Sequence, residues 1–334
     1  MIRLGALRSR SSPIIRKTRT PPLEVAISPQ QLTDLHRASS ARAALDLALH
    51  WGGILLVVAL AHHFQHWTGY GLAVLLIAGF QNSLVSLAHE AWHNKTFGAA
   101  ALNHFVGAWL YAYPVGLTYY NDMYRHLEHH RLIGKVEDPD WINYSNTHFE
   151  SRRATRRFLI GKLFGMHLVT TLTQYLIRGK PKIHLDTESK KRSVPIKREL
   201  ASLFVVQVIL FTAFALLGAW WEYFLLWILP LSTFTSFFIA TRALLEHAHA
   251  EAPSEPEERL FDFAPSPLGH FFFSPRHFHL HALHHKYPSA PHYRLPELKR
   301  EIRSDAELGY PGAQRGGYLQ AFREYLASLP EAAN

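Results

Sequence analysis

The chain has no cysteine among its 334 residues, and only 18% of its residues are charged. The absence of cysteine excludes disulfide bonds, thiolate zinc sites and iron–sulfur clusters. Charge is also unevenly distributed, because Asp, Glu, Lys and Arg are all missing between Asp46 and Glu90, from Leu200 to Trp221, and from Tyr223 to Thr241. The chain therefore separates long apolar runs from polar segments that hold nearly all of its charge.

These uncharged runs are long enough to cross a lipid bilayer, which takes about 20 apolar residues per helix. The first run is about twice that length, and the polar stretch His62–His66 with Gly69 and Gly71 interrupts it. The later two runs are separated by Glu222, and Pro230 is expected to bend the second of them. The sequence thus predicts an all-α integral membrane protein with four transmembrane helices in two hairpins.

The positions of Lys and Arg predict how the chain is oriented. Basic residues are frequent before residue 20 and between residues 152 and 192, whereas the hairpin tips carry Trp67, Tyr70, Trp220, Trp221 and Tyr223. Lys and Arg favour the cytoplasmic side, and aromatic residues favour the membrane interface. We expect cytoplasmic termini, in a bacterial inner membrane. A nucleic-acid partner is excluded, because the basic residues are not interleaved with stacking aromatics on a soluble fold.

Three histidine clusters border the apolar runs. They read H-E-A-W-H (His89, His93), H-L-E-H-H (His126, His129, His130) and H-A-L-H-H (His281, His284, His285). Residues at i, i+3 and i+4 share one face of a helix, so each cluster projects imidazoles from a single face. Eight imidazoles without any cysteine predict a metal site built from nitrogen ligands, which suit iron, zinc and copper.

The first cluster also matches a zinc-protease motif, in which Glu90 would be the general base between His89 and His93. A catalytic zinc needs three protein ligands and one open position. Eight imidazoles are too many for one such ion, so the sequence favours a site for two metal ions. A membrane zinc hydrolase is the alternative from a different class of enzyme.

The first two clusters can share a metal only if they lie on the same side of the membrane. The stretch Thr96–Asn121 between them is uncharged and rich in aromatics, and Gly107, Pro114 and Gly116 interrupt it. A single crossing by this stretch would separate the two clusters. We therefore expect an interfacial or re-entrant segment that returns to the side from which it started.

The remaining segments suggest one membrane domain between two tails. We expect a polar cytoplasmic tail over residues 1–40, a membrane domain over 41–300, and a cytoplasmic tail over 301–334. Ser28 followed by Pro29 predicts the start of a helix within the first tail. A basic amphipathic region is expected from about Ser151 to Lys197, and a loop rich in Pro and Glu from Glu251 to Pro267.

The order of the three clusters, together with the residues that follow them, resembles the integral-membrane fatty acid desaturase superfamily, the di-iron enzymes with three histidine boxes. Supporting segments are H-R-L-I-G-K-V-E-D-P-D (130–140), R-A-L-L-E-H (242–247) and H-H-K-Y-P-S-A-P-H-Y-R-L-P-E-L (284–298). The resemblance extends from about Leu47 to Leu298. It implies a histidine-rich cap at the cytoplasmic mouth of a four-helix bundle.

The resemblance also implies the chemistry and the ligands. The family oxidises unactivated C–H bonds of lipid chains with two iron ions, O2 as co-substrate, and electrons from a separate ferredoxin, rubredoxin or haem cytochrome. Transferred to this chain, the iron ligands are His89, His93, His126, His129, His130, His281, His284 and His285, with His247 as the ninth. A fatty acyl desaturase is the favoured reading. Carotenoid ketolation or hydroxylation, fatty acid hydroxylation and oxidative decarboxylation remain open alternatives.

One position departs from the family pattern. Related desaturases often carry an Asn shortly before the third cluster, where this chain has His277, one helical turn before His281. His277 is therefore a candidate for an extra ligand or a supporting hydrogen-bond donor. Acids expected to orient the imidazoles through their second nitrogen are Glu90, Glu128, Asp138, Asp140 and Glu246. His62, His63 and His66 are excluded as ligands, because they belong to the opposite face of the membrane.

Overall fold

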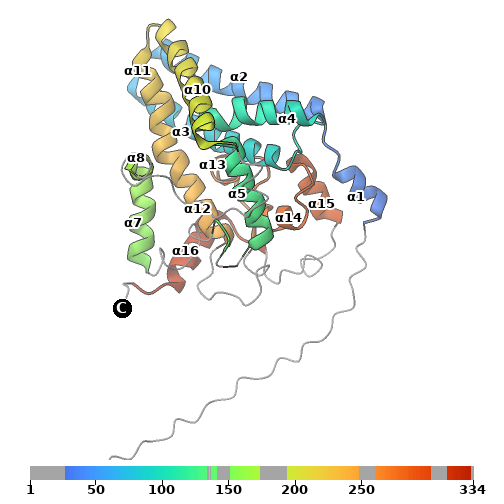
Figure 1. Cartoon of the computed structure of the whole chain (residues 1–334). Helices are drawn as coiled ribbons and strands as arrows, with labels where there is room; N and C mark the ends of the chain where they lie inside the picture. The colour runs from blue at the N-terminus through green and yellow to red at the C-terminus, as the bar shows by residue number, and fades with distance from the viewer. Residues whose placement is uncertain are drawn as a thin grey trace, which may run out of the picture.

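The computed structural model describes residues 27–133, 135, 137–140, 151–173, 194–247, 260–301 and 314–331. The basic segment before residue 20, the basic residues between 180 and 192, and positions 251–259 of the expected Pro/Glu-rich loop lie outside the described residues. The apolar runs form a group of long helices, and the histidine-rich segments gather at one end of it (Figure 1).

Among the described residues, four helical stretches are long and apolar enough to span a membrane, as the sequence predicts. The first hairpin is α2 (Ser40–Phe64) and α3 (Trp67–Trp92), which are joined by Gln65 and His66. The second hairpin is α10 (Ile196–Leu216) and the helical stretch Trp220–His247. The expected class, an all-α membrane protein with two helical hairpins, is confirmed.

The last of these helices is irregular around Pro230. It begins with α11 (Trp220–Tyr223) and ends with α12 (Ser236–His247), and between them lie two π-helical segments, η5 (Phe224–Ile228) and η6 (Leu231–Thr235). Proline has no backbone N–H to donate to the preceding turn, so wide turns on either side of Pro230 are a physical consequence of its presence.

A buried acid joins the tips of the two hairpins. Glu222 is fully buried and accepts hydrogen bonds from the hydroxyl of Tyr70 at 2.5 Å and from Nδ1 of His62 at 3.1 Å. An aromatic contact adds to these hydrogen bonds, because the ring of Tyr70 packs edge-on against the ring of Trp221. His62 is thus engaged at the tips, at the far end of α2 and α3 from the first histidine cluster (Figure 1).

The segment between the first two clusters turns back, as expected of an interfacial or re-entrant segment, so that the two clusters meet. It consists of α4 (Ala100–Val106), η1 (Gly107–Ala112) and the 3-10 turn η2 (Tyr113–Val115), and α5 (Tyr119–Leu132) follows. Gly98 N donates to Ser40 Oγ at 3.1 Å, and Trp51 Nε1 donates to Leu110 O at 3.1 Å. The segment therefore runs along the first half of α2 before α5 leads back, and both clusters lie on one side.

Gly107 allows this segment to approach α3 closely. A Cβ atom at Gly107 would lie 2.7 Å from Cβ of Ala91 and 2.6 Å from the ring of Tyr119. Both distances are shorter than real side-chain contacts, so a larger residue would force the segment away from α3 and α5. The glycine that the sequence marks as a break is thus also a packing position.

The remaining elements form a cap over the histidine end of the bundle. They are α13 (Pro267–Phe272), α14 (His281–Lys286), the 3-10 turn η8 (His292–Arg294) and α15 (Leu295–Glu301). Strand β1 (Asp262–Phe263) pairs in parallel with β2 (Gln314–Arg315), and α16 (Tyr318–Ser328) follows. The basic region forms α7 (Arg152–Leu163) and α8 (Met166–Thr173) beside α12.

The described parts of the two expected tails pack against this cap. Helix α1 (Pro29–Leu35) begins with Ser28 in a capping box, as the sequence predicts, and Leu35 is buried with Leu283 and Leu298. In α16, Tyr318 is buried beside Phe263. Residues near both ends of the described chain therefore belong to the same folded body as the histidine clusters.

Candidate metal centre

All nine histidines expected as ligands come together at the histidine end of the bundle. They come from the end of α3, from α5, from the last residue of α12 and from α14. Eight of them form two groups in which potential ligand atoms lie within 4.8 Å of one another, and His281 adjoins the second. The first, the five-histidine group, contains His89, His93, His126, His130 and His284.

The second, the four-histidine group, contains His129, His247, His281 and His285. Three of these are mutually close, and the fourth, His281, places Nε2 at 2.9 Å from Nε2 of His247 and at 3.1 Å from Nε2 of His285. In the five-histidine group, Nε2 of His126 is 2.9 Å from Nε2 of both His93 and His130. The two groups account for every histidine that the sequence assigns to the centre.

Helical spacing distributes each cluster between the two groups. On α5, His126 and His130 are four residues apart and enter the five-histidine group, whereas His129 enters the other. On α14 the division is reversed, because the i, i+4 pair His281 and His285 enters the four-histidine group and His284 enters the five-histidine group. Two HxxHH helices that face each other in this way thus divide their imidazoles between two groups.

The two groups are in direct contact. The rings of His130 and His285, one from each group, are stacked with their centroids 4.0 Å apart. His129 and His285 meet edge-on with centroids 5.0 Å apart. These short distances between rings of the two groups suit one shared centre more than two independent sites.

Burial favours the neutral form of several of these imidazoles. It lowers the pKa of His126, His130, His281, His284 and His285 well below the ordinary histidine value, and the neighbouring imidazoles add to that effect. Burial together with Lys95 lowers the pKa of His93 to about 4. Only the neutral imidazole binds a metal, so these pKa values prepare the side chains for coordination.

The arrangement fits a bound cation better than it fits imidazoles alone. Two nitrogens at 2.9 Å can share one proton, but Nε2 of His126 is that close to two other ring nitrogens at once. In addition, Nε2 of His89 is buried and has no hydrogen-bond partner among the described residues. Buried polar atoms rarely lack a partner, and a metal ion would satisfy both observations.

Asp138 contacts one of the histidines expected as ligands. Its carboxylate accepts from Nδ1 of His129 at 2.9 Å, and both side chains are buried. This contact leaves Nε2 of His129 for a metal. Glu246 lies near another ligand, with Oε2 at 3.8 Å from Nδ1 of His281.

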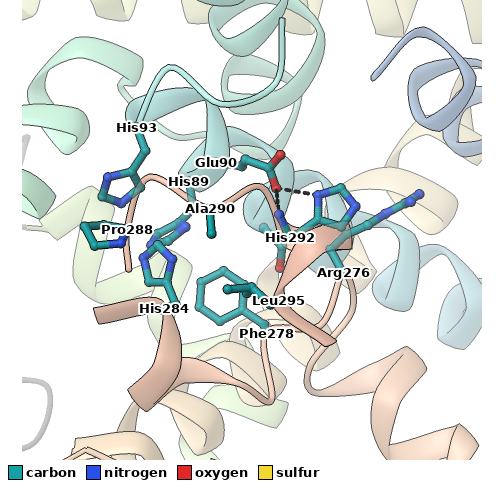
Figure 2. A pocket seen from close by; sticks show the side chains of 11 residues that line it. His89, Glu90, His93, Arg276, Phe278, His284, Pro288, Ala290, His292 and Leu295 are labelled. Atoms are coloured by element: carbon teal, nitrogen blue, oxygen red, sulfur yellow. Dashed lines mark hydrogen bonds and ion pairs between the residues drawn. The ribbon is translucent and has the colours of Figure 1, made fainter. Parts of the chain in front are cut away.

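The other acids contact residues outside the two groups. Asp140 pairs with Arg125, and Glu128 pairs with Arg131. Glu90 accepts from Nδ1 and from the backbone N–H of His292, and Figure 2 shows it turned away from His89, His93 and His284. The expectation that Glu90 orients a ligand is therefore wrong, because His292 occupies its carboxylate.

Glu90 and His292 belong to a buried charge network that the sequence reading missed. Arg276 Nη1 pairs with Oδ1 of Asp46 at 2.5 Å, and Arg276 also contacts Nδ1 of His50. His292 Nε2 lies 3.5 Å from Oδ2 of the same Asp46. Asp46 is the last charged residue before the first apolar run, and a buried charge needs a partner. The position of Asp46 next to this run was the sequence signal from which a buried charge network could have been predicted.

This network ties the third cluster to α2 and α3. Arg276 and His277 both have left-handed backbone conformations, with φ of 59° and 58°. Such angles are strained for residues other than glycine, and the contacts of Arg276 offset the strain. His277 lies beside His270 and His279 and is in neither histidine group. The structure therefore does not bring His277 to the metal centre as a ligand.

A cavity of ≈ 200 Å³ opens onto both histidine groups. Its wall includes His89 and His126 from one group and His129, His247 and His281 from the other. Apolar side chains line another part of it, among them Val85 of α3 and Ile239 of α12, and charged side chains line the rest, namely Asp122, Arg125, Asp140, Arg242 and Glu246. A smaller cavity on the far side of His89 lies between His93, His284 and the Glu90–His292 contact (Figure 2).

Comparison with known proteins agrees with this geometry. The family model described as fatty acid desaturase matches residues 65–315. A dihydrorhizobitoxine desaturase from Bradyrhizobium elkanii is 31% identical over 113 residues, an alignment that spans 33% of this chain and 32% of that protein. The family match includes α3, the second hairpin and all nine clustered histidines. The chain therefore belongs to the fatty acid desaturase family.

Proposed function

We propose that this protein is a membrane di-iron enzyme that uses O2 to introduce a double bond into the acyl chain of a lipid. Family membership makes it a desaturase-like oxidoreductase. The observation that carries the finer proposal is the division of the nine histidines between two adjoining groups. That arrangement offers each of two irons a set of neutral nitrogen ligands. When bound, the two irons supply the redox chemistry that removes hydrogen from an unactivated carbon with O2.

The cavity beside the histidines supports a lipid chain as the substrate. Val85 and Ile239 belong to helices long enough to span the membrane, so the bundle itself supplies part of the apolar cavity wall. An acyl chain partitions into the hydrocarbon region and can enter between such helices. The protein's contribution is to hold one methylene pair of that chain against both histidine groups, because positioning decides which carbon reacts.

The contacts of Glu90 count against the zinc-hydrolase alternative. In that mechanism Glu90 would accept a proton from a water bound to zinc between His89 and His93. Its carboxylate is instead bonded to His292 and belongs to the charge network around Asp46. The nine-histidine arrangement also leaves most of its imidazoles without a role around a single zinc.

Desaturation is favoured among the oxidations that this centre can support. The relative from Bradyrhizobium elkanii is named for a desaturation, and its alignment covers about a third of each chain. Each turnover needs two external electrons, and we propose that a separate ferredoxin, rubredoxin or small haem cytochrome delivers them on the cytoplasmic face. The termini and the histidine centre are proposed to lie on that face of a bacterial inner membrane.

The test is a fatty acid profile of bacterial cells that express the protein. Mass spectrometry of the extracted lipids should show fatty acids two mass units lighter, and only in aerated cultures. Cells with His129→Ala should lack them, and cells with His63→Ala should keep them, because His63 is exposed at the hairpin tip. A product sixteen mass units heavier would contradict desaturation and indicate hydroxylation on the same centre.

A further inference from the structure

Three arginines on α7 have no partner in the described structure. Arg153, Arg156 and Arg157 are spaced i, i+3 and i+4, so their guanidinium groups share one face of the helix. All three are exposed, and none makes a side-chain hydrogen bond or ion pair within the described residues. Arg152 differs from them, because it binds backbone carbonyls at the end of α16. Three unpartnered cations on one face are therefore available to a ligand.

The same face continues into an apolar surface. The arginines border a hollow of ≈ 500 Å³ that is also lined by Ile160, Gly161, Phe164, Met166 and Glu331. Phe164 is 79% exposed, Ile160 51% and Met166 49%. Exposed apolar residues that cluster beside charges are characteristic of a binding surface or of contact with a membrane. The hollow is thus cationic at one end and apolar at the other.

Contacts with the fourth membrane helix indicate how deep in the membrane each end of the hollow lies. Leu159, in the middle of α7, is buried in one cluster with Leu244 and Leu245, which lie in the last turn before His247. Helices α7 and α8 both contact η6, which ends at Thr235, nine residues before Leu244 and therefore roughly 14 Å further into the span at 1.5 Å per residue. The apolar end of the hollow thus reaches membrane depth, and the arginines lie at the surface.

We propose that this hollow binds an anionic phospholipid. The guanidinium groups of Arg153, Arg156 and Arg157 would donate to the phosphate oxygens, which match the planar fork of arginine. The acyl chains would cover Ile160, Phe164 and Met166. The observation that supports this assignment is the order of side chains along α7 and α8. The arginines come first and exposed apolar side chains follow, which matches the phosphate and acyl chains of a phospholipid. This assignment is independent of the reaction at the histidine centre.

An acidic electron carrier fits this surface less well. A soluble carrier would pair with the arginines but would leave Phe164 and Met166 facing lipid or water. Helix α7, which carries the arginines, also lies on the side of α12 away from α5 and α14, so that α12 stands between α7 and these two histidine-bearing helices (Figure 1). A phospholipid satisfies both ends of the hollow.

The experiment is native mass spectrometry of the full chain purified in a neutral detergent. The probes are palmitoyl-oleoyl phosphatidylglycerol and the phosphatidylcholine with the same acyl chains. The unmodified protein should bind phosphatidylglycerol roughly tenfold more strongly, because each basic residue near a phosphate contributes to the preference. Equal binding of the two lipids by the unmodified protein would overturn the proposal without the use of any variant.

Variants then locate the site. Arg153→Gln/Arg156→Gln/Arg157→Gln should bring the binding of the two lipids to within about twofold of each other. The matched control Arg37→Gln/Arg300→Gln/Arg323→Gln removes the same charge from exposed positions outside the hollow and should keep the preference. Phe164→Asn should weaken the binding of both lipids.

Two results would count against the site. One is a triple variant that retains the unmodified preference for phosphatidylglycerol. The other is a triple variant with unchanged lipid binding but slower reduction by an acidic ferredoxin, which would assign the arginines to an electron carrier.

Discussion

Asp138 accepts a hydrogen bond from Nδ1 of His129 at 2.9 Å, and both side chains are buried. His129 is the one residue of its cluster that belongs to the four-histidine group, while His126 and His130 on the same helix belong to the other group. The carboxylate of Asp138 thus fixes the ring orientation of His129, the residue of α5 that belongs to the four-histidine group. This contact makes Asp138 the clearest acid partner of any proposed ligand in the described structure.

Removing the charge of Asp138 should weaken the metal centre without removing a ligand. We expect Asp138→Asn to lower iron affinity by roughly 10- to 100-fold, the usual effect of losing such a support. Iron per chain, measured after dialysis against a weak chelator, would show the loss. Asp34→Asn is the matched control, because Asp34 is exposed on α1. Unchanged iron retention in Asp138→Asn would contradict the supporting role.

The pair of Asp46 and Arg276 should hold the third cluster in place. Asp46 is nearly fully buried, and Arg276 is 17% exposed. Breaking a buried ion pair by removing one partner costs about 3–5 kcal/mol, and the partial exposure of Arg276 favours the lower end. We therefore expect Arg276→Met to lower the unfolding temperature in detergent and to loosen iron. Adding Asp46→Asn to that variant should restore part of the loss, and a strictly additive double variant would refute the pairing.

Acidification provides a test of the buried imidazoles in the metal-free protein. The pKa of His93 is about 4, below the unfolded value of 6.5, so this ring stays neutral between those values only in the folded state. The folded apoprotein should therefore still take up ferrous iron at about pH 5.5, where free histidine is mostly protonated. Its stability should fall as pH drops below 6.5, because the unfolded chain then binds more protons. Half-loss of iron uptake near pH 6.5 in the folded protein would argue against burial as the cause.

The re-entrant segment makes a definite prediction for membrane topology. Reporter fusions after Lys95 and after Asn334 should give cytoplasmic signals, and a reporter at Gly69 should give the opposite signal. The reason is that α4, η1 and η2 return the chain to the side of the first cluster. Opposite signals at Lys95 and Asn334 would mean an odd number of crossings between them, whereas the second hairpin alone gives two.

The sequence predicted most of the fold because its signals were local. Uncharged runs with polar breaks located both hairpins, and Ser28 before Pro29 located the start of α1. The re-entrant segment followed from an argument about sides, since His93 and His126 had to meet. Eight of the nine histidines were predicted from their spacing in three clusters, which is visible in the chain, and His247 was added from the resemblance to the desaturase family.

What the sequence could not provide depends on contacts between distant residues. The alternation of His284 and His285 between the two groups is set by how α14 faces α5, and no local pattern encodes that. The role of Glu90 was misjudged for the same reason, because its partner His292 lies about two hundred positions away in the chain. Glu222 similarly joins two hairpin tips that only the folded structure brings together.

The most direct measurement of the central claim is the iron content of the purified protein and of two single-ligand variants. The division into two groups predicts close to two irons per chain in the unmodified protein after expression in iron-replete medium. His93→Ala, in the five-histidine group, and His281→Ala, in the four-histidine group, should each lower the content toward one iron, because each removes an imidazole from a different ion. A single tightly bound zinc without iron, or one iron lost completely in both variants, would contradict a centre built for two ions.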